Sequence, residues 1–190
     1  MLEIYITPKK ENEDKSQVAE ALLQRILKKK GYTQKPVIKK NDYGKPFLDN
    51  MKGFHFNISH SGDYVGIAVS DQVVGFDLQK KETQKDVMAI AKRWFNKEEV
   101  KELKKTSMYH RHEHFYDIWT KKESYMKYTG LGFALPMKYF RIGKNDGRCT
   151  VFQDGNPLSQ IELTGLSWQQ DYRMAICSER DLKPEVIPMY

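Results

Sequence analysis

The sequence is poor in cysteine and has no long apolar run. Only two of its 190 residues are cysteines, Cys149 and Cys177, and they fit neither a zinc-binding spacing nor a disulfide framework. Both fall in strand-like segments, where a free cysteine ordinarily acts as a small buried hydrophobic residue. This usage is typical of the reducing cytoplasm. The absence of any stretch of about 18 apolar residues predicts a protein without a membrane span.

A secretory signal is not expected either, because residues 1–6 are too short and wrongly flanked for one. Hydrophobic residues make up 39% of the chain and charged residues 30%, which predicts a soluble globular protein rather than a disordered one. Cytoplasmic localisation follows from these features as an expectation.

Positive charge exceeds negative charge. There are 32 lysines and arginines against 25 acidic residues, for a net charge of +7, and many lysines come in pairs or triplets, as at 28–30, 80–81 and 121–122. Such a surface keeps a protein soluble, or it attracts a polyanion such as nucleic acid, a phosphorylated ligand or an acidic protein. Charge by itself does not choose between these interpretations.

Hydrophobic periodicity predicts the elements. Helices are expected over 13–30, 85–94, 97–105 and 110–128. Strands are expected over 2–7, 54–59, 64–70, 73–79, 139–142, 149–153, 160–164 and 172–178. Gly31 and Gly130 end helices, Asn96 is an N-cap, and the turn at 70–72 indicates a hairpin between 64–70 and 73–79. The order predicts an α+β fold with halves 1–79 and 80–190 joined near 79–84.

Reactive groups concentrate in four patches. They are Gly44-Lys45-Pro46, the stretch Asn57-Ile58-Ser59-His60-Ser61-Gly62, the strand Val74-Gly75-Phe76-Asp77-Leu78-Gln79, and the helix Trp119-Thr120-Lys121-Lys122-Glu123-Ser124-Tyr125-Met126-Lys127. Strand alternation places Asp77 and Gln79 on the face opposite Phe76 and Leu78. On the helix, Trp119, Glu123 and Lys127 follow one another at i, i+4 and i+8.

Taken together and in this order, the four patches resemble the Sfp-type 4'-phosphopantetheinyl transferases of the holo-acyl-carrier-protein synthase superfamily. Those enzymes carry G-K-P, an F-N-[IL]-S-H-[ST] strand end, a [VI]-G-[IVC]-D-[IVL]-E strand and a W-[ST]-x-K-E-[SA]-x-x-K helix. The segments 93–99 and 172–177 also resemble family segments, so the likeness extends from about Tyr43 onward. The resemblance implies two similar α+β halves about a pseudo-twofold axis, with coenzyme A and magnesium in the cleft between them.

The resemblance also implies a reaction and its residues. Phosphopantetheine would pass from coenzyme A, with Mg²⁺, to a serine of an acidic acyl or peptidyl carrier protein, and 3',5'-ADP would leave. The metal ligands would be Asp77, Glu123 and Gln79. The catalytic residues would be Glu123, Lys127 and His60. The coenzyme A-binding residues would be Lys45, Ser59, His60, Lys122, Lys127 and Lys15. The base that deprotonates the serine would be Glu123 or a water on the metal.

Two departures from the family pattern affect these roles. Gln79 stands where the family has an acid, which predicts a two-carboxylate metal site with the amide as a secondary ligand. The basic cluster that binds the nucleotide in the family is poorly represented, so Lys15 is the one candidate on the first helix. Basic surface and the apolar residues Met126 and Phe133 would dock the carrier. A monomer that binds neither nucleic acid nor membrane is expected.

Other interpretations of the residues stay open. His110 and His114 stand four apart on a helix, as zinc ligands can, but the HExxH signature is absent. A magnesium nuclease would use a carboxylate and a lysine two apart on a strand, and Glu102 and Lys104 have that spacing within a predicted helix. A nucleic-acid-binding module would expose aromatic residues among arginines and lysines on a sheet, whereas the aromatic residues here are expected mainly in the core.

Overall fold

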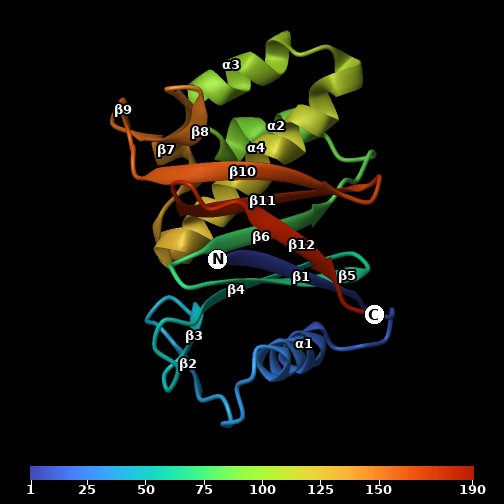
Figure 1. Ribbon diagram of the computed structural model, residues 1–190. Helices are drawn as coiled ribbons and strands as arrows, with labels where there is room; N and C mark the ends of the chain where they lie inside the picture. Colours follow the sequence, from blue (N-terminus) through green and yellow to red (C-terminus); the bar gives the residue numbers. More distant parts are fainter.

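The computed structural model describes residues 1–190 and places the chain in four layers (Figure 1). Two β-sheets lie face to face in the middle, helix α1 covers the lower sheet, and helices α2, α3 and α4 cover the upper one. Helices and strands are largely segregated and almost all strand pairs are antiparallel. This arrangement confirms the predicted α+β class.

The helices are α1 (Lys15–Lys29), α2 (Val87–Trp94), α3 (Lys97–Lys105) and α4 (Met108–Thr129), with short 3₁₀ turns η1 (Gly132–Ala134) and η2 (Met137–Tyr139). The strands are β1 (Leu2–Pro8), β2 (Ile38–Lys40), β3 (Pro46–Leu48), β4 (His55–Ser61), β5 (Tyr64–Ser70), β6 (Gly75–Lys80), β7 (Phe140–Asn145), β8 (Arg148–Gln153), β9 (Asn156–Pro157), β10 (Ile161–Trp168), β11 (Tyr172–Glu179) and β12 (Pro184–Pro188).

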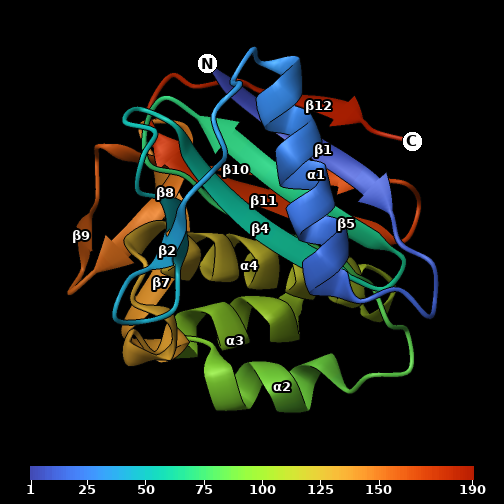
Figure 2. The same ribbon diagram turned by 90° about the horizontal axis from the view of Figure 1, so that it is seen from below.

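The lower sheet has the strand order β12-β1-β5-β4. Helix α1 crosses its outer face, as the view from below shows (Figure 2). The apolar positions of α1 recur at helical spacing, and Leu22, Leu23 and Ile26 are buried against residues of β1, β4 and β5. Asp14 caps this helix by accepting the N–H groups of Ser16 and Gln17.

The upper sheet has the strand order β10-β11-β6. On its inner face, Phe76 and Leu78 join residues of β1, β5 and β11 in a core between the two sheets. On its outer face a second core, formed with α2, α3 and α4, surrounds Phe115 and Phe140. Asp77, one residue from each of Phe76 and Leu78, therefore faces the helices and not the inter-sheet core, as strand alternation predicts.

Side chains, and not a backbone ladder, join the two sheets along β4 and β6. The N–H groups of Phe76, Leu78 and Lys80 on β6 donate to side-chain oxygens of β4, which belong to Asn57, Ser59 and Ser61 respectively. The three bonds are 2.9, 3.0 and 2.9 Å long. They satisfy the outer edge of β6, which would otherwise carry unpaired N–H groups. The predicted strands thus meet through polar side chains spaced two residues apart.

The hairpin expected between 64–70 and 73–79 is wrong. Strand β5 pairs on one side with β4, through the turn at Gly62 and Asp63, and on the other side with β1. Strand β6 pairs with β11 instead. The turn at 70–72 does reverse the chain, but it carries the chain from the lower sheet to the upper one, and a local turn signal does not say which strand will be the partner.

Most other expectations about the elements are confirmed. Gly130 has φ 71° and ends α4, Gly31 has φ 81° just beyond α1, and Asn96 caps α3 within a capping box that Glu99 completes. Strand β12 was not predicted, and it pairs in parallel with β1 at the opposite end of the chain. The division at residue 79 and the pseudo-twofold relation stay predictions. None of the helices combines the length and the apolar character that a membrane-spanning helix requires.

Candidate active site

A cleft of about 360 Å³ opens where the end of β4, strand β6 and helix α4 meet. It collects residues that are up to 69 positions apart in the chain. Its lining consists of Ile58, Ser59, His60, Asp77, Gln79, Trp119, Glu123 and Lys127. The structure therefore brings together six of the predicted site residues: Ser59, His60, Asp77, Gln79, Glu123 and Lys127.

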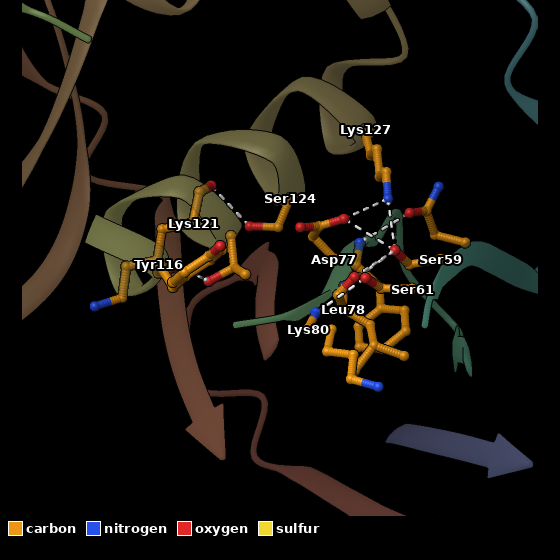
Figure 3. A network of polar contacts seen from close by, with 12 residues as sticks. Ser59, Ser61, Asp77, Leu78, Lys80, Tyr116, Lys121, Ser124 and Lys127 are labelled. Carbon is orange, nitrogen blue, oxygen red and sulfur yellow. Dashed lines mark hydrogen bonds and ion pairs between the residues drawn. The ribbon is translucent and has the colours of Figure 1, made fainter. Parts of the chain in front are cut away.

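A polar triangle of the buried Ser59 and Asp77 and the half-buried Lys127 forms one wall of this cleft (Figure 3). Lys127 Nζ lies 2.7 Å from Asp77 Oδ1 and 2.9 Å from Ser59 Oγ, and the Ser59 hydroxyl donates to the same Asp77 oxygen at 2.9 Å. Ser59 Oγ also accepts the N–H of Leu78. Asp77 is 5% exposed, so these bonds fix its carboxylate where little water competes.

Close packing of α4 on β6 sets the distance between their side chains. A Cβ atom added to Gly75 would overlap the backbone of α4 at Ser124 and Tyr128. Glycine therefore lets the helix backbone lie directly on the strand. Asp77, two residues along β6, and Glu123, adjacent to Ser124 on α4, consequently face the same cleft.

Glu123 is strongly perturbed by its surroundings. Its pKa is raised to about 7, because burial and, to a lesser extent, the nearby Asp77 carboxylate raise it more than Lys127 lowers it. Two carboxylates held close together away from water disfavour each other's charge. The site thus contains an acid that titrates near neutral pH, which is a property of proton-transfer groups.

Asp77 has a second oxygen, Oδ2, that is buried and has no hydrogen-bond partner. Buried carboxylate oxygens without a partner are uncommon and call for a ligand. Magnesium prefers one or two carboxylates together with substrate phosphates, and Asp77 and Glu123 offer two carboxylates, with the amide oxygen of Gln79 in the same cleft. The donor set therefore fits a hard divalent cation.

His60 is on the open side of the cleft, next to two lysines. Its pKa is lowered, chiefly by partial burial and then by the positive charges of Lys15 and Lys127. The charge of Lys15, at the start of α1, therefore acts on His60. His60 and Lys127 line the cleft from β4 and α4, an arrangement suited to phosphate.

Lys45 is tied to the protein backbone. Its Nζ donates to the carbonyl oxygens of Val74 and Tyr128 at 3.2 and 3.1 Å, and burial lowers its pKa to about 8. Asn41 in the same turn donates to the carbonyl of Gly130. The turn therefore holds the end of α4 against the start of β6, and it lines a smaller adjoining cleft of about 210 Å³ that Lys127 also borders.

Lys122 does not reach the cleft, which corrects the expectation that it binds phosphate. Its side chain is fully buried, and its Nζ donates to both carboxylate oxygens of Glu99 and to the carbonyl of Phe140. The reason is helical geometry: successive side chains lie about 100° apart around a helix, so Lys122 points into the core while Glu123 faces the cleft.

A large apolar groove of about 850 Å³ adjoins the cleft. Trp119 and Glu123 border both cavities, and Met126 and Phe133 line the groove. Trp119 also packs against Phe95 and Phe115. It therefore both anchors α4 in the core and lines the site. Other groove residues come from the end of α2 and the segment that follows α4: Arg93, Trp94, Pro136, Met137, Lys138 and Tyr139.

Sequence patterns alone did not assign a role to four residues that shape the site. Asn57 and Ser61 flank Ser59 at intervals of two, and that spacing of polar residues on a predicted strand could have indicated a polar seam. Gly75 lies within the strand that carries Asp77, and a glycine inside a strand often marks a place where another backbone packs closely. Glu99 was visible as the N3 residue after the N-cap, but its contact with Lys122 is long-range.

The histidine group at the start of α4 does not form a metal centre. His114 Nδ1 contacts the hydroxyl of Thr106 at 2.9 Å, and no group of three or more His, Cys, Asp or Glu side chains is placed to hold a metal. Glu102 and Lys104 lie on helix α3 and not on a strand, so the strand arrangement expected of a nuclease is absent.

Comparison with known proteins decides the family. The family model for the 4'-phosphopantetheinyl transferase superfamily matches residues 73–177, from just before β6 to β11. The chain belongs to the 4'-phosphopantetheinyl transferase superfamily. The matched region contains Asp77, Gln79, Glu123 and Lys127, which are four of the eight residues that line the cleft.

Relatives within the superfamily match three quarters of the chain or more. The 4'-phosphopantetheinyl transferase Sfp of Bacillus subtilis (strain 168) is 31% identical over 184 residues, which cover 95% of this chain and 80% of the relative. The 4'-phosphopantetheinyl transferase ffp of Bacillus subtilis is 30% identical over 185 residues, with the same coverage. The 4'-phosphopantetheinyl transferase gsp of Aneurinibacillus migulanus is 32% identical over 142 residues, 75% of this chain and 58% of the relative. The similarity thus extends well beyond residues 73–177.

Proposed function

We propose that this protein transfers the 4'-phosphopantetheine group of coenzyme A to a serine of an acidic acyl or peptidyl carrier protein, with release of 3',5'-ADP. Membership of the superfamily supports the class of reaction. The observation that carries the assignment to particular residues is the convergence of Asp77 and Glu123, from β6 and α4, on one cleft that Lys127 also lines.

Magnesium is the proposed cofactor. Asp77 would hold it through the unpartnered Oδ2 oxygen and Glu123 through its carboxylate, with Gln79 as a secondary ligand. When bound, magnesium supplies positive charge to the pyrophosphate oxygens on which negative charge accumulates as the bond breaks.

Lys127 and His60 are proposed to bind the pyrophosphate. Lys127 is held at the cleft by Asp77 and Ser59, and a fixed ammonium stabilises developing phosphate charge better than one that must reorganise. The Ser59 hydroxyl already bonds Asp77, Lys127 and the N–H of Leu78. Its proposed role is therefore to position Asp77 and Lys127 as well as to border the pyrophosphate.

Glu123 is the proposed proton acceptor. The oxygen of the carrier serine would attack the β-phosphorus of coenzyme A, and the bond from that phosphorus to the bridging oxygen would break. The bridging oxygen leaves with 3',5'-ADP and takes the electron pair. The ionised Glu123 carboxylate would take the serine proton directly or through a water beside it.

The nucleotide is proposed to lie toward the turn of Gly44 and Lys45, where the adjoining cleft meets Lys127. Lys15 is proposed to reach the 3'-phosphate, since its charge already acts on His60. Because Lys45 Nζ makes two backbone bonds, its contribution to nucleotide binding would come from the turn that it holds in place, together with its charge.

The large groove is the proposed docking region for the carrier and the pantetheine arm. Phe133 and Tyr139 beside it are 84% and 65% exposed, and Arg93 and Lys138 contribute positive charge to its lining. An apolar surface rimmed by positive charge suits an acidic carrier protein. The protein is proposed to act as a monomer in the cytoplasm. Its two free cysteines are consistent with that reducing compartment.

Mass spectrometry of apo carrier proteins tests the proposal. The purified protein, coenzyme A and Mg²⁺ are incubated with acidic carriers of the fatty-acid, polyketide and nonribosomal-peptide classes. We expect a mass gain of one phosphopantetheine group on the carrier serine, and none with Asp77→Asn, whose folding is checked by circular dichroism. An unmodified mass for every carrier class would overturn the assignment.

A further inference from the structure

A buried ion pair connects three segments beneath the groove. Lys122 and Glu99 are 0% and 1% exposed. Lys122 Nζ lies 2.9 and 2.8 Å from the two Glu99 oxygens and 2.6 Å from the carbonyl oxygen of Phe140. All three donors of the ammonium are thereby used.

Glu99 is also saturated with hydrogen bonds. Beyond the two from Lys122, it accepts the N–H of Asn96 through Oε2 at 2.9 Å and the N–H of Ile142 through Oε1 at 2.8 Å. The pair therefore joins the start of α3, the middle of α4 and the start of β7. We call Glu99, Lys122 and their three backbone partners, at Asn96, Phe140 and Ile142, the Glu99–Lys122 hub.

Stability alone does not account for a charged pair at this place. The surroundings are apolar: the rings of Phe95 and Phe140 lie 5.7 and 4.3 Å from Lys122 Nζ. In such places a buried ion pair is often no more stabilising than well-packed apolar residues. Charged hydrogen bonds differ from apolar contacts in being directional and short, so the hub fixes the relative placement of the segments that it joins.

Those same segments continue into the walls of the groove. Trp94 precedes Asn96 by two residues, Tyr139 directly precedes Phe140, and Glu123 directly follows Lys122. One further bond connects the walls near the surface, from Asn96 Nδ2 to the carbonyl oxygen of Lys138 at 3.3 Å. The hub thus joins three segments that each continue into residues lining the groove.

We propose that the Glu99–Lys122 hub is a positioning device that sets the width of the groove and its alignment with Glu123. This inference rests on the proposed function, because the groove is there assigned to the carrier and the pantetheine arm. Neither residue touches substrate. Their effect on the reaction would come from the walls that receive the carrier, while the binding of coenzyme A nucleotide at the far side of the cleft would be unaffected.

Two variants test the hub. In Glu99→Gln/Lys122→Met, an amide oxygen remains for the Asn96 or Ile142 N–H, the new amide N–H can serve the Phe140 carbonyl, and no charge is left buried without a partner. In Asn96→Ser, the N-cap is kept, because serine caps as well as asparagine, but the surface bond to Lys138 is lost. If the double variant does not fold, Asn96→Ser still tests whether the bonds between these segments set the groove.

Steady-state kinetics separate positioning from general damage. For the double variant we expect kcat/KM for the carrier to fall by about tenfold, less than the roughly hundredfold that a 1 Å misplacement can cost, with a smaller fall for Asn96→Ser. The Kd of 3',5'-ADP, which lacks the pantetheine arm and was placed outside the groove, is measured by calorimetry and should stay at its wild-type value in both variants. Wild-type carrier kinetics in the folded variants, or an equal loss of 3',5'-ADP affinity, would refute the positioning role.

A readout that needs no activity keeps this test distinct from that of the proposed function. Of the three tryptophans, Trp94 and Trp119 line the groove and Trp168 lies on β10 against Tyr64. In a Trp168→Phe background, acrylamide quenching therefore reports on the groove. Quenching should increase in both hub variants, and unchanged quenching refutes the proposal. If the wild-type protein modifies no carrier, the proposed function fails while the quenching result still decides on the hub.

Discussion

The raised pKa of Glu123 makes a measurable prediction about metal affinity. Its value of about 7 arises from burial and from Asp77, against the opposing effect of Lys127. Metal must bind the ionised carboxylate. With this pKa, about nine-tenths of Glu123 is ionised at pH 8 and about one-tenth at pH 6, so the affinity for Mg²⁺ should be about tenfold weaker at pH 6. A glutamate with its ordinary value of 4.5 would give almost no change.

Isothermal titration calorimetry measures both consequences. At pH 6, binding of Mg²⁺ should release close to one proton, which is counted by comparing buffers of different ionisation enthalpy. Lys127→Met removes the one influence that lowers the Glu123 pKa, so the midpoint of the affinity curve should move to higher pH.

Two controls isolate Glu123 from its neighbours. Glu123→Gln should bind more weakly at all pH values and lose the dependence between pH 6 and 8. His60→Gln should preserve most of the dependence, because the His60 pKa is lowered and its charge appears mainly at more acidic pH. Equal wild-type affinities at pH 6 and 8, or a pH dependence that survives in Glu123→Gln, would show that the reasoning is wrong.

Three further predictions concern the same cleft. Because the pKa of Glu123 is raised from 4.5 to about 7 in the folded protein, its ionisation lowers stability as the pH rises from about 4.5 to about 7. Glu123→Gln should therefore raise the free energy of unfolding at pH 8 by on the order of 3 kcal/mol, and by less toward pH 5, in urea titrations. No gain at pH 8 would contradict the assigned burial. Gly75→Ala should lower both Tm and transferase activity, since the added Cβ overlaps the backbone of α4; a wild-type Tm in calorimetry would show that the strand and helix can separate freely. Gln79→Ala should weaken Mg²⁺ binding less than Asp77→Ala, and equal losses by titration would make Gln79 a primary ligand.

Local patterns predicted most elements correctly because their causes are local. Helix α3 was predicted with its observed bounds of 97–105, since the cap at Asn96 and the end at Lys105 are readable in a short window. Alternation predicted which face of β6 carries Asp77. These features depend on backbone geometry and on residues a few positions apart, and tertiary packing did not override them.

Partners distant in sequence were harder to predict. The pairing of β1 with β12 joins the two ends of the chain, and no signal within either segment specifies it. The false hairpin between β5 and β6 has the same origin, because a turn fixes the direction of the chain and not the neighbour of the strand. The meeting of β4 and β6 through polar side chains could be suspected from the spacing of Asn57, Ser59 and Ser61, but not assigned.

For the site, the order of motifs in the sequence determined the family and the set of candidate residues. Tertiary structure decided which of them share the cleft. Glu123 and Lys122 are neighbours in the chain, yet one faces the cleft and the other is bonded to Glu99 in the core. Side-chain direction depends on which face of α4 packs against β6 and α3, and that packing is set by contacts between residues far apart in sequence, which a single sequence does not encode in any local pattern.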